Sequence, residues 1–197
     1  MAEAMFRWRA LLSGAPLSVQ SAGVATEGVS PPEPTIAAMR RMGIDVSAHR
    51  SQLVTEGMLL RSDLVVGMTR SHVWEAALIH PEIVPHAFVI GELARLNEEI
   101  GGRVVGEPLE HWLERLHDRR NQGRRGPRAG DEIPDPYGRR KGVHRKVALR
   151  LEEIVFQLGD CAFEPLYEFS RSRWCEGRLI WHPGMDGPAA PGTIIDS

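Results

Sequence analysis

Cysteine and histidine are the residue types that most often carry nucleophilic or metal chemistry, because a thiolate attacks and an imidazole binds metals or moves protons. The 197 residues contain two cysteines, Cys161 and Cys175, both late in the chain and not arranged as a Cys-x-x-Cys pair. We interpret both as ordinary thiols of a reduced, cytoplasmic protein. None of the eight histidines belongs to a His-Glu-x-x-His or Cys/His ligand pattern, so no metal site is predicted.

Asp135 is the carboxylate with the most suggestive surroundings, since it opens the sequence "DPYG" between two basic stretches. Judged by position alone, an aspartate before a proline in a Gly/Pro-rich loop commonly caps a turn. The basic stretches are "RRNQGRRGPR" and "GRRKGVHRK", which are typical of solvated surface but can also steer a phosphoprotein or a nucleic acid. No aromatic residues are interleaved in the way that single-strand binders need, which argues against nucleic acid.

The composition is that of a globular protein, with 42% hydrophobic and 25% charged residues, and the length suits one domain with an additional tail. A net charge of −2 and a pI near 6.5 argue against a globally basic nucleic-acid binder. No apolar run approaches the roughly 18 residues that a membrane span needs, and no secretory signal pattern is visible. These features predict a cytoplasmic location and no membrane partner.

Hydrophobic spacing predicts helices that alternate with short strands. Apolar residues on one face, Met1, Met5, Trp8 and Leu12, predict a helix from the first residue. We expect further helices over 35–42, 71–79, 92–100, 109–119 and 142–158, the last one ended by Gly159. We expect strands at "LSVQSAG" (17–23), "DLVVGM" (63–68, buried on both faces) and "AFVI" (87–90), and a mobile loop over 119–134.

This alternation predicts an α/β fold with a parallel sheet flanked by helices. Only three strands are readable, and a chain that opens with a helix leaves the first βα unit incomplete, so we expect the first central strand to be missing from the 197 residues. Residues 1–160 are expected to form this N-terminally incomplete domain, and residues 161–197 a largely disordered C-terminal tail.

Five segments together resemble the low-molecular-weight protein-tyrosine phosphatase family. In order they are "MAEAMFRW" (1–8), "SAG" (21–23), "GIDVSAHRSQLV" (43–54), "DLVVGMTRSH" (63–72) and "DPYG" (135–138). No single segment is specific, but their order and spacing fit, and the likeness covers about residues 1–158.

The resemblance implies a phosphate loop, Cys-x5-Arg-Ser-Pro, that follows a central strand and leads directly into the helix matching Met1 onward. Neither cysteine completes this motif, because Tyr167 stands six residues after Cys161 and Trp181 six residues after Cys175. The nucleophile and the phosphate-binding arginine are therefore expected to be absent from residues 1–197, and this chain alone is expected to be inactive.

Two explanations for this absence compete: Met1 is an internal methionine of a longer protein, or the chain is a degenerate relative. We favour the first, because removing a central strand would leave its neighbours without hydrogen-bond partners. The segments "LSVQS" and "DLVVGM" nevertheless keep their apolar character. The codons that precede Met1 would decide between the two.

The resemblance also implies roles for individual residues. Asp135 would be the general acid that protonates the leaving oxygen and later activates water. Tyr137 would stack on the substrate ring, although a surface loop tyrosine is an equal alternative. His49 would support the phosphate loop through a hydrogen bond, and Ser21 would border that loop. The family often has another aromatic residue where Gly138 stands here, which leaves the substrate preference open.

The function implied by the resemblance is hydrolysis of phosphotyrosine in protein substrates through a cysteinyl-phosphate intermediate, without a metal or an organic cofactor. An arginine-phosphate phosphatase or an arsenate reductase of the same fold are alternatives. A catalytically dead module that binds phosphoproteins is a third, from a different class of function.

Overall fold

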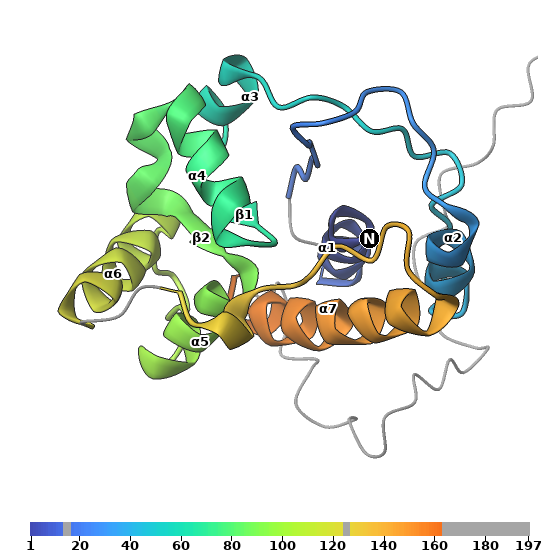
Figure 1. Ribbon diagram of the computed structural model, residues 1–197. Coiled ribbons are helices and arrows are strands. Elements are labelled where there is room, and N and C mark those ends of the chain that lie inside the picture. Colours follow the sequence, from blue (N-terminus) through green and yellow to red (C-terminus); the bar gives the residue numbers. More distant parts are fainter. Residues whose placement is uncertain (14–16, 124–126, 163–197) are drawn as a thin grey trace, which may run out of the picture. The chain divides into compact units, whose positions relative to one another are not determined.

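Helices alternate with two short parallel strands in the computed structural model, which describes residues 1–13, 17–123 and 127–162 (Figure 1). In chain order the elements are α1 (Ala2–Ser13), α2 (Glu33–Arg40), α3 (Glu56–Leu60), β1 (Val65–Gly67), α4 (Arg70–Ile79), the 3-10 helix η1 (Pro81–His86), β2 (Ala87–Val89), α5 (Ile90–Glu99), α6 (Leu109–Gln122), the 3-10 helix η2 (Ala129–Asp131) and α7 (Lys141–Ala162). Every helix expected from the sequence forms, with ends displaced by a few residues. The expected tail lies outside the described residues from position 163 onward, so its disorder stays a prediction.

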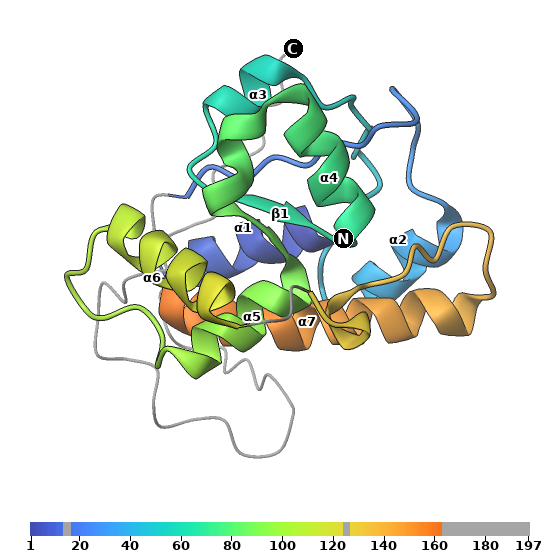
Figure 2. The same cartoon turned by 60° about the vertical axis from the view of Figure 1, so that its left-hand side comes forward.

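The sheet of the described residues has two parallel strands, which confirms the predicted α/β class. In β1 and β2, Val65 pairs with Ala87 and Gly67 pairs with Val89. The crossover between them runs through α4 and η1 (Figure 2). β2 is fully buried, but Val65 and Val66 of β1 are only half-buried. Val66 nevertheless packs against the main core and Val65 against a second cluster around Ile83, so both faces of β1 are covered, although less completely than predicted.

The predicted strand over 17–23 does not form. Gly23 makes an isolated parallel bridge with Leu53, and the segment from 17 to 22 is extended but belongs to no described strand ladder. Side chains hold it instead, since Arg7 donates to the Val19 carbonyl at 2.7 and 3.0 Å and Gln52 donates to the Ser21 carbonyl at 2.8 Å. A strand needs a neighbouring backbone, which local sequence preference cannot supply.

Helix α7 is the central support of the described core, with α1, α2 and α5 packed along it (Figures 1 and 2). Its buried residues recur at helical spacing, as predicted. They are His144, Val147, Ala148, Leu151, Ile154, Val155 and Leu158. The predicted helix end at Gly159 is wrong: α7 continues to Ala162, and a Cβ on Gly159 would lie 2.6 Å from Cγ of Arg9. Glycine serves here for close packing on α1.

The region 119–134 was expected to be a mobile loop; parts of its described residues are helical instead, and its mobility stays a prediction. Helix α6 extends to Gln122, and η2 places Asp131 in a buried position. In the described part of the chain, no helix combines the length and the apolar character that crossing a bilayer requires.

Candidate functional site

Glu3, in the first turn of α1, is the centre of a polar cluster. Its carboxylate pairs with Arg7 one turn later, at 2.8 Å. The Ser21 hydroxyl donates a hydrogen bond to the same carboxylate, and the His49 Nδ1 atom lies 3.6 Å from it. A carboxylate in the first turn of a helix also interacts favourably with the helix dipole. The structure thus brings Ser21 and His49 together through a residue that the sequence analysis did not single out.

The segment that carries His49 is held by local hydrogen bonds. The Asp45 carboxylate accepts from the Ser47 N–H at 2.9 Å and from its hydroxyl at 3.0 Å, and these bonds lower the pKa of Asp45 below its usual value. The His49 N–H donates to the Val46 carbonyl at 3.1 Å. Val46 itself is buried in the main core. The turn therefore places the His49 imidazole at the start of α1 by fixing the backbone around it.

A cavity of about 800 Å³ lies beside the first turns of α1. Its walls come from α1, from the segments 26–35 and 43–51, and from Tyr137. Glu3 and His49 both line the cavity. Tyr137, which is 69% exposed, also contributes to its wall. Two of the four predicted site residues, His49 and Tyr137, thus line the cavity, and Ser21 is hydrogen-bonded to Glu3, which also lines it.

Asp135 is exposed and does not belong to the cavity wall. Its carboxylate accepts a hydrogen bond from the Tyr137 N–H at 2.9 Å, so the turn-capping role expected from its position is confirmed. Pro136, between the two, is buried. The capped turn keeps Asp135 within two residues of the aromatic ring that lines the cavity.

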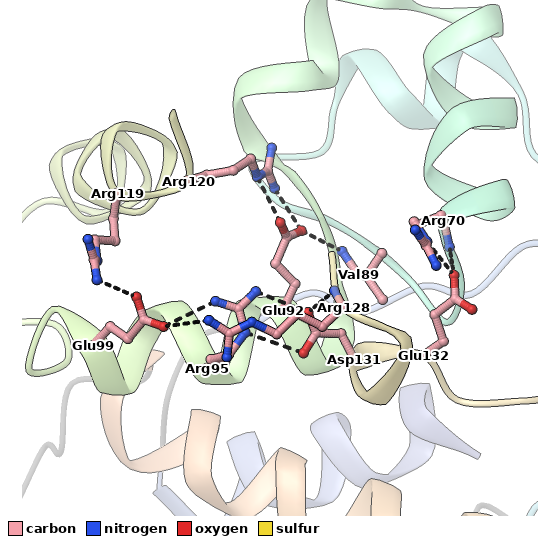
Figure 3. A network of polar contacts seen from close by, with 10 residues as sticks. All are labelled: Arg70, Val89, Glu92, Arg95, Glu99, Arg119, Arg120, Arg128, Asp131 and Glu132. Atoms are coloured by element: carbon pink, nitrogen blue, oxygen red, sulfur yellow. Dashed lines mark hydrogen bonds and ion pairs between the residues drawn. The ribbon is translucent and has the colours of Figure 1, made fainter. Parts of the chain in front are cut away.

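Two anchors tie the start of this loop to the sheet side of the fold, one between backbone groups and one, drawn in Figure 3, through the Glu132 side chain. The Ile133 N–H donates to the carbonyl of Met68, just beyond β1, at 2.8 Å. One oxygen of Glu132 accepts from both the N–H and the Nε atom of Arg70, at 3.1 and 3.0 Å. These hydrogen bonds from Arg70 lower the pKa of Glu132 below its usual value.

A third anchor is buried and joins η2 to α5. Arg95 donates to both oxygens of Asp131, at 3.0 and 3.4 Å, and Asp131 also accepts from the Arg128 N–H at 2.7 Å (Figure 3). The hydrogen bond to Asp131 raises the pKa of Arg95. A Cβ on Gly91 would lie 2.5 Å from the Asp131 carbonyl oxygen, so α5 and η2 touch through backbone.

Arg95 and Asp131 were missed in the sequence analysis, because they stand 36 residues apart and nothing local links them. The Gly/Pro-rich composition of 119–134 suggested mobility instead. No group of three or more metal-ligating side chains occurs within residues 1–13, 17–123 and 127–162. The absence of a metal or an organic cofactor from the chemistry stays a prediction.

Comparison of the sequence with known proteins identifies the family of this chain. Residues 1–95 match the family model described as low molecular weight phosphotyrosine protein phosphatase. An arsenate reductase of Staphylococcus saprophyticus is 31% identical over 105 residues, which cover 49% of this chain and 79% of that protein. The chain belongs to the low-molecular-weight phosphotyrosine protein phosphatase family. The resemblance stated from five sequence segments is thereby confirmed.

Another relative and two solved structures extend the comparison. A probable low-molecular-weight protein-tyrosine phosphatase, EpsP, of Ralstonia nicotianae is 33% identical over 82 residues, or 41% of this chain and 57% of that protein. The crystal structure of a low-molecular-weight protein-tyrosine phosphatase from T. tengcongensis is 26% identical, with a TM-score of 0.59 over 80% of this chain and 86% of that chain. An arginine phosphatase, YwlE, from Geobacillus stearothermophilus is 21% identical with a TM-score of 0.56 over 80% of each chain, and it supports the fold alone.

Proposed function

We propose that this chain forms the body of a protein phosphatase that hydrolyses phosphotyrosine through a cysteinyl-phosphate intermediate, with Asp135 as its general acid and base. The observation that carries the proposal is the cavity beside the first turn of α1, which the aromatic ring next to Asp135 helps to line. The N-terminal end of a helix favours a phosphoryl dianion, because its free N–H groups and its dipole attract negative charge. Asp135, bonded to the backbone of the residue whose ring lines the cavity, would protonate the oxygen that leaves.

In this proposal Glu3, Ser21 and His49 support the phosphate-binding end of α1. Glu3 accepts a hydrogen bond from the Ser21 hydroxyl and lies 3.6 Å from Nδ1 of His49, so the three groups form one polar cluster, and Glu3 and His49 also line the cavity. Tyr137 would stack on the ring of the substrate and set its distance from Asp135. None of these roles requires a metal ion or an organic cofactor, and a cytoplasmic location stays part of the same proposal.

The chemistry also needs a thiolate and an arginine fork, since a phosphoryl group is transferred to sulfur while its oxygens are held. Neither cysteine of residues 1–197 is followed by an arginine six positions later. An assay must therefore supply a Cys-x5-Arg-Ser-Pro loop together with a leading strand, fused ahead of Met1.

The test compares hydrolysis of an aryl phosphate by the 197-residue chain and by the fused chain. We expect turnover from the fused chain alone, and none when its loop cysteine is changed to serine. Asp135→Asn in the fused chain should lower kcat about 10²- to 10⁴-fold, the usual contribution of a general acid. The loss should shrink for an aryl group that leaves readily without a proton. A fused, folded chain that shows no turnover would overturn the proposal.

The assay also includes two other substrates, because similar proteins are named as an arsenate reductase and an arginine phosphatase. The arsenate reductases of staphylococci favour arsenate as a second candidate, and the fused chain should then consume a thiol reductant when arsenate is added. Hydrolysis of phosphoarginine rather than phosphotyrosine would indicate an arginine phosphatase, the activity named for the YwlE structure. Binding of phosphopeptides without any turnover would indicate a binding module instead.

A further inference from the structure

A basic surface follows Tyr137 directly along the chain. Residues 136–151 contain no acidic side chain. All six of their Lys and Arg side chains are exposed; Arg150 pairs with Glu153, and none of the other five forms an ion pair with any residue that the structure describes. We call them the basic surface: Arg139, Arg140, Lys141, Arg145 and Lys146.

The first part of the basic surface is held in a fixed place beside the cavity. The Arg139 N–H donates to the Pro136 carbonyl at 3.0 Å, and Gly138 has a φ of +70°, as a tight turn requires at this position. The Val143 N–H then donates to the Arg140 carbonyl at 2.9 Å and starts α7. The cations therefore project from an ordered turn whose other end, Tyr137, lines the cavity.

The charge on this surface is not compensated locally. Arg140 and Lys141 stand at the N-terminal end of α7, where the helix dipole is positive and where the first turn has no acidic residue. Lys141 and Arg145 are one turn apart, so their like charges repel. The chain as a whole carries a net charge of −2, so the sign of this surface is opposite to that of the whole chain. Of the acids nearby, Asp135 caps its own turn and Asp45 is engaged by Ser47.

We propose that the basic surface docks an acidic stretch of a phosphorylated protein whose phosphoryl-bearing residue enters the cavity beside Tyr137. This inference rests on the proposed function and names the class of its substrate. Because an extended peptide advances at most about 3.5 Å per residue, the acidic residues lie within a few positions of the phosphorylated one. No aromatic residue stands between Arg139 and Lys146 to stack on bases, which favours a protein segment over a single-stranded nucleic acid.

The first experiment measures binding to the 197-residue chain, without turnover, by fluorescence anisotropy. The probe is a labelled phosphotyrosine peptide with glutamates on both sides, and its partner probe has glutamines at the same positions. We expect the glutamate peptide to bind at least about tenfold more tightly at low salt, and the advantage to fade near 1 M salt, where the screening length falls to about 3 Å. Equal affinity for the two peptides would overturn the proposal.

A matched pair of charge reversals localises the effect. Arg140→Glu and Arg61→Glu change the net charge equally, and both side chains are exposed. Arg61 directly follows α3, which lies apart from the start of α7 in both views (Figures 1 and 2). We expect Arg140→Glu to weaken binding of the glutamate peptide about three- to tenfold, and Arg61→Glu to leave it unchanged. An equal loss in both variants would show that only net charge matters, and would reject the docking surface.

Two outcomes separate this inference from the proposed function. If the fused chain hydrolyses both peptides with the same KM, the docking surface is rejected while the phosphatase stands. If the glutamate peptide binds as expected but the fused chain hydrolyses nothing, the phosphatase is rejected while the surface stands. A single-stranded oligonucleotide of matched charge that binds as tightly, and loses affinity in Arg140→Glu, would replace the protein segment by nucleic acid.

Discussion

The carboxylate of Asp131 accepts two hydrogen bonds from the guanidinium of Arg95, although the pair joins a 3-10 turn to a helix that precedes it by more than thirty residues. Asp131 is only 6% exposed, and it also caps its own turn through the Arg128 N–H. Two residues later, the Ile133 N–H donates to the carbonyl of Met68, just beyond β1. Asp135 follows after two more residues. The buried pair therefore fixes the point from which the proposed acid loop departs.

Asp131→Asn should destabilise the fold, because the amide cannot accept the same pair of charged hydrogen bonds from the half-buried Arg95 guanidinium. We expect the free energy of unfolding to fall by about 1–3 kcal/mol. Urea unfolding followed by circular dichroism measures it. The matched control is Glu153→Gln, which breaks the exposed Arg150–Glu153 pair and should cost less than about 1 kcal/mol. Equal losses in the two variants would contradict a structural role for the buried pair.

Gly91→Ala tests the backbone contact between α5 and η2. A methyl group at this position would lie 2.5–2.8 Å from three backbone atoms of Asp131, none of which can rotate away. We expect a loss of about 1–3 kcal/mol in the free energy of unfolding, as for other over-packed sites. Gly142→Ala is the control, since nothing lies within 4 Å of its Cβ and alanine favours a helix by up to about 1 kcal/mol. A neutral Gly91→Ala would mean that η2 can move without cost.

Local sequence pattern was sufficient where an element is defined by its own residues. The buried stripe of α7 and the strand that contains Val65 follow from side-chain periodicity and from short apolar runs, and both form. Of the predicted site residues, His49 and Tyr137 line one cavity and Ser21 is bonded to Glu3 in its wall, while the catalytic and binding roles of all four stay predictions.

Long-range partners explain what the sequence did not reveal. The segment 17–22 has strand-like residues but finds no strand to pair with in the described part of the chain. Gly159 looks like a helix stop, yet it is small because Arg9 packs against it. Glu3 and Arg95 bond to residues that are distant in the sequence, Ser21 and Asp131, so no local sequence pattern predicts their contacts.

The Arg70–Glu132 anchor should make stability depend on acid pH. Its hydrogen bonds lower the pKa of Glu132 in the folded state below the ordinary value of 4.5. The unfolded chain then binds the proton more readily, so the anchor stabilises the fold above that value and loses its effect as the pH falls through the lower, folded-state pKa. We expect Glu132→Gln to be less stable than the native chain at neutral pH, and the difference to close in acid.

Arg70→Gln provides the control for this anchor through a double-mutant cycle in urea unfolding. The two single variants should share one interaction energy at neutral pH, so that the double variant costs less than their sum. Additive losses, or a difference between Glu132→Gln and the native chain that persists unchanged in acid, would contradict the anchor.

Glu3→Ala tests whether the cluster at the start of α1 holds the extended segment that carries Ser21. Removing the carboxylate breaks its hydrogen bond from the Ser21 hydroxyl and its ion pair with Arg7, which itself holds the Val19 carbonyl, so the segment should open more often from its bridge at Gly23. The Gly23 N–H donates to the Gln52 carbonyl at 2.8 Å, and its hydrogen exchange reports that opening. A loss of about 1.4 kcal/mol in local stability would accelerate the exchange tenfold. Glu33→Ala, at an exposed glutamate in the first turn of α2, is the matched control and should leave the exchange of Gly23 unchanged. The same acceleration in both variants would mean that the cluster does not tie Ser21 to the helix on which the proposed phosphate site depends.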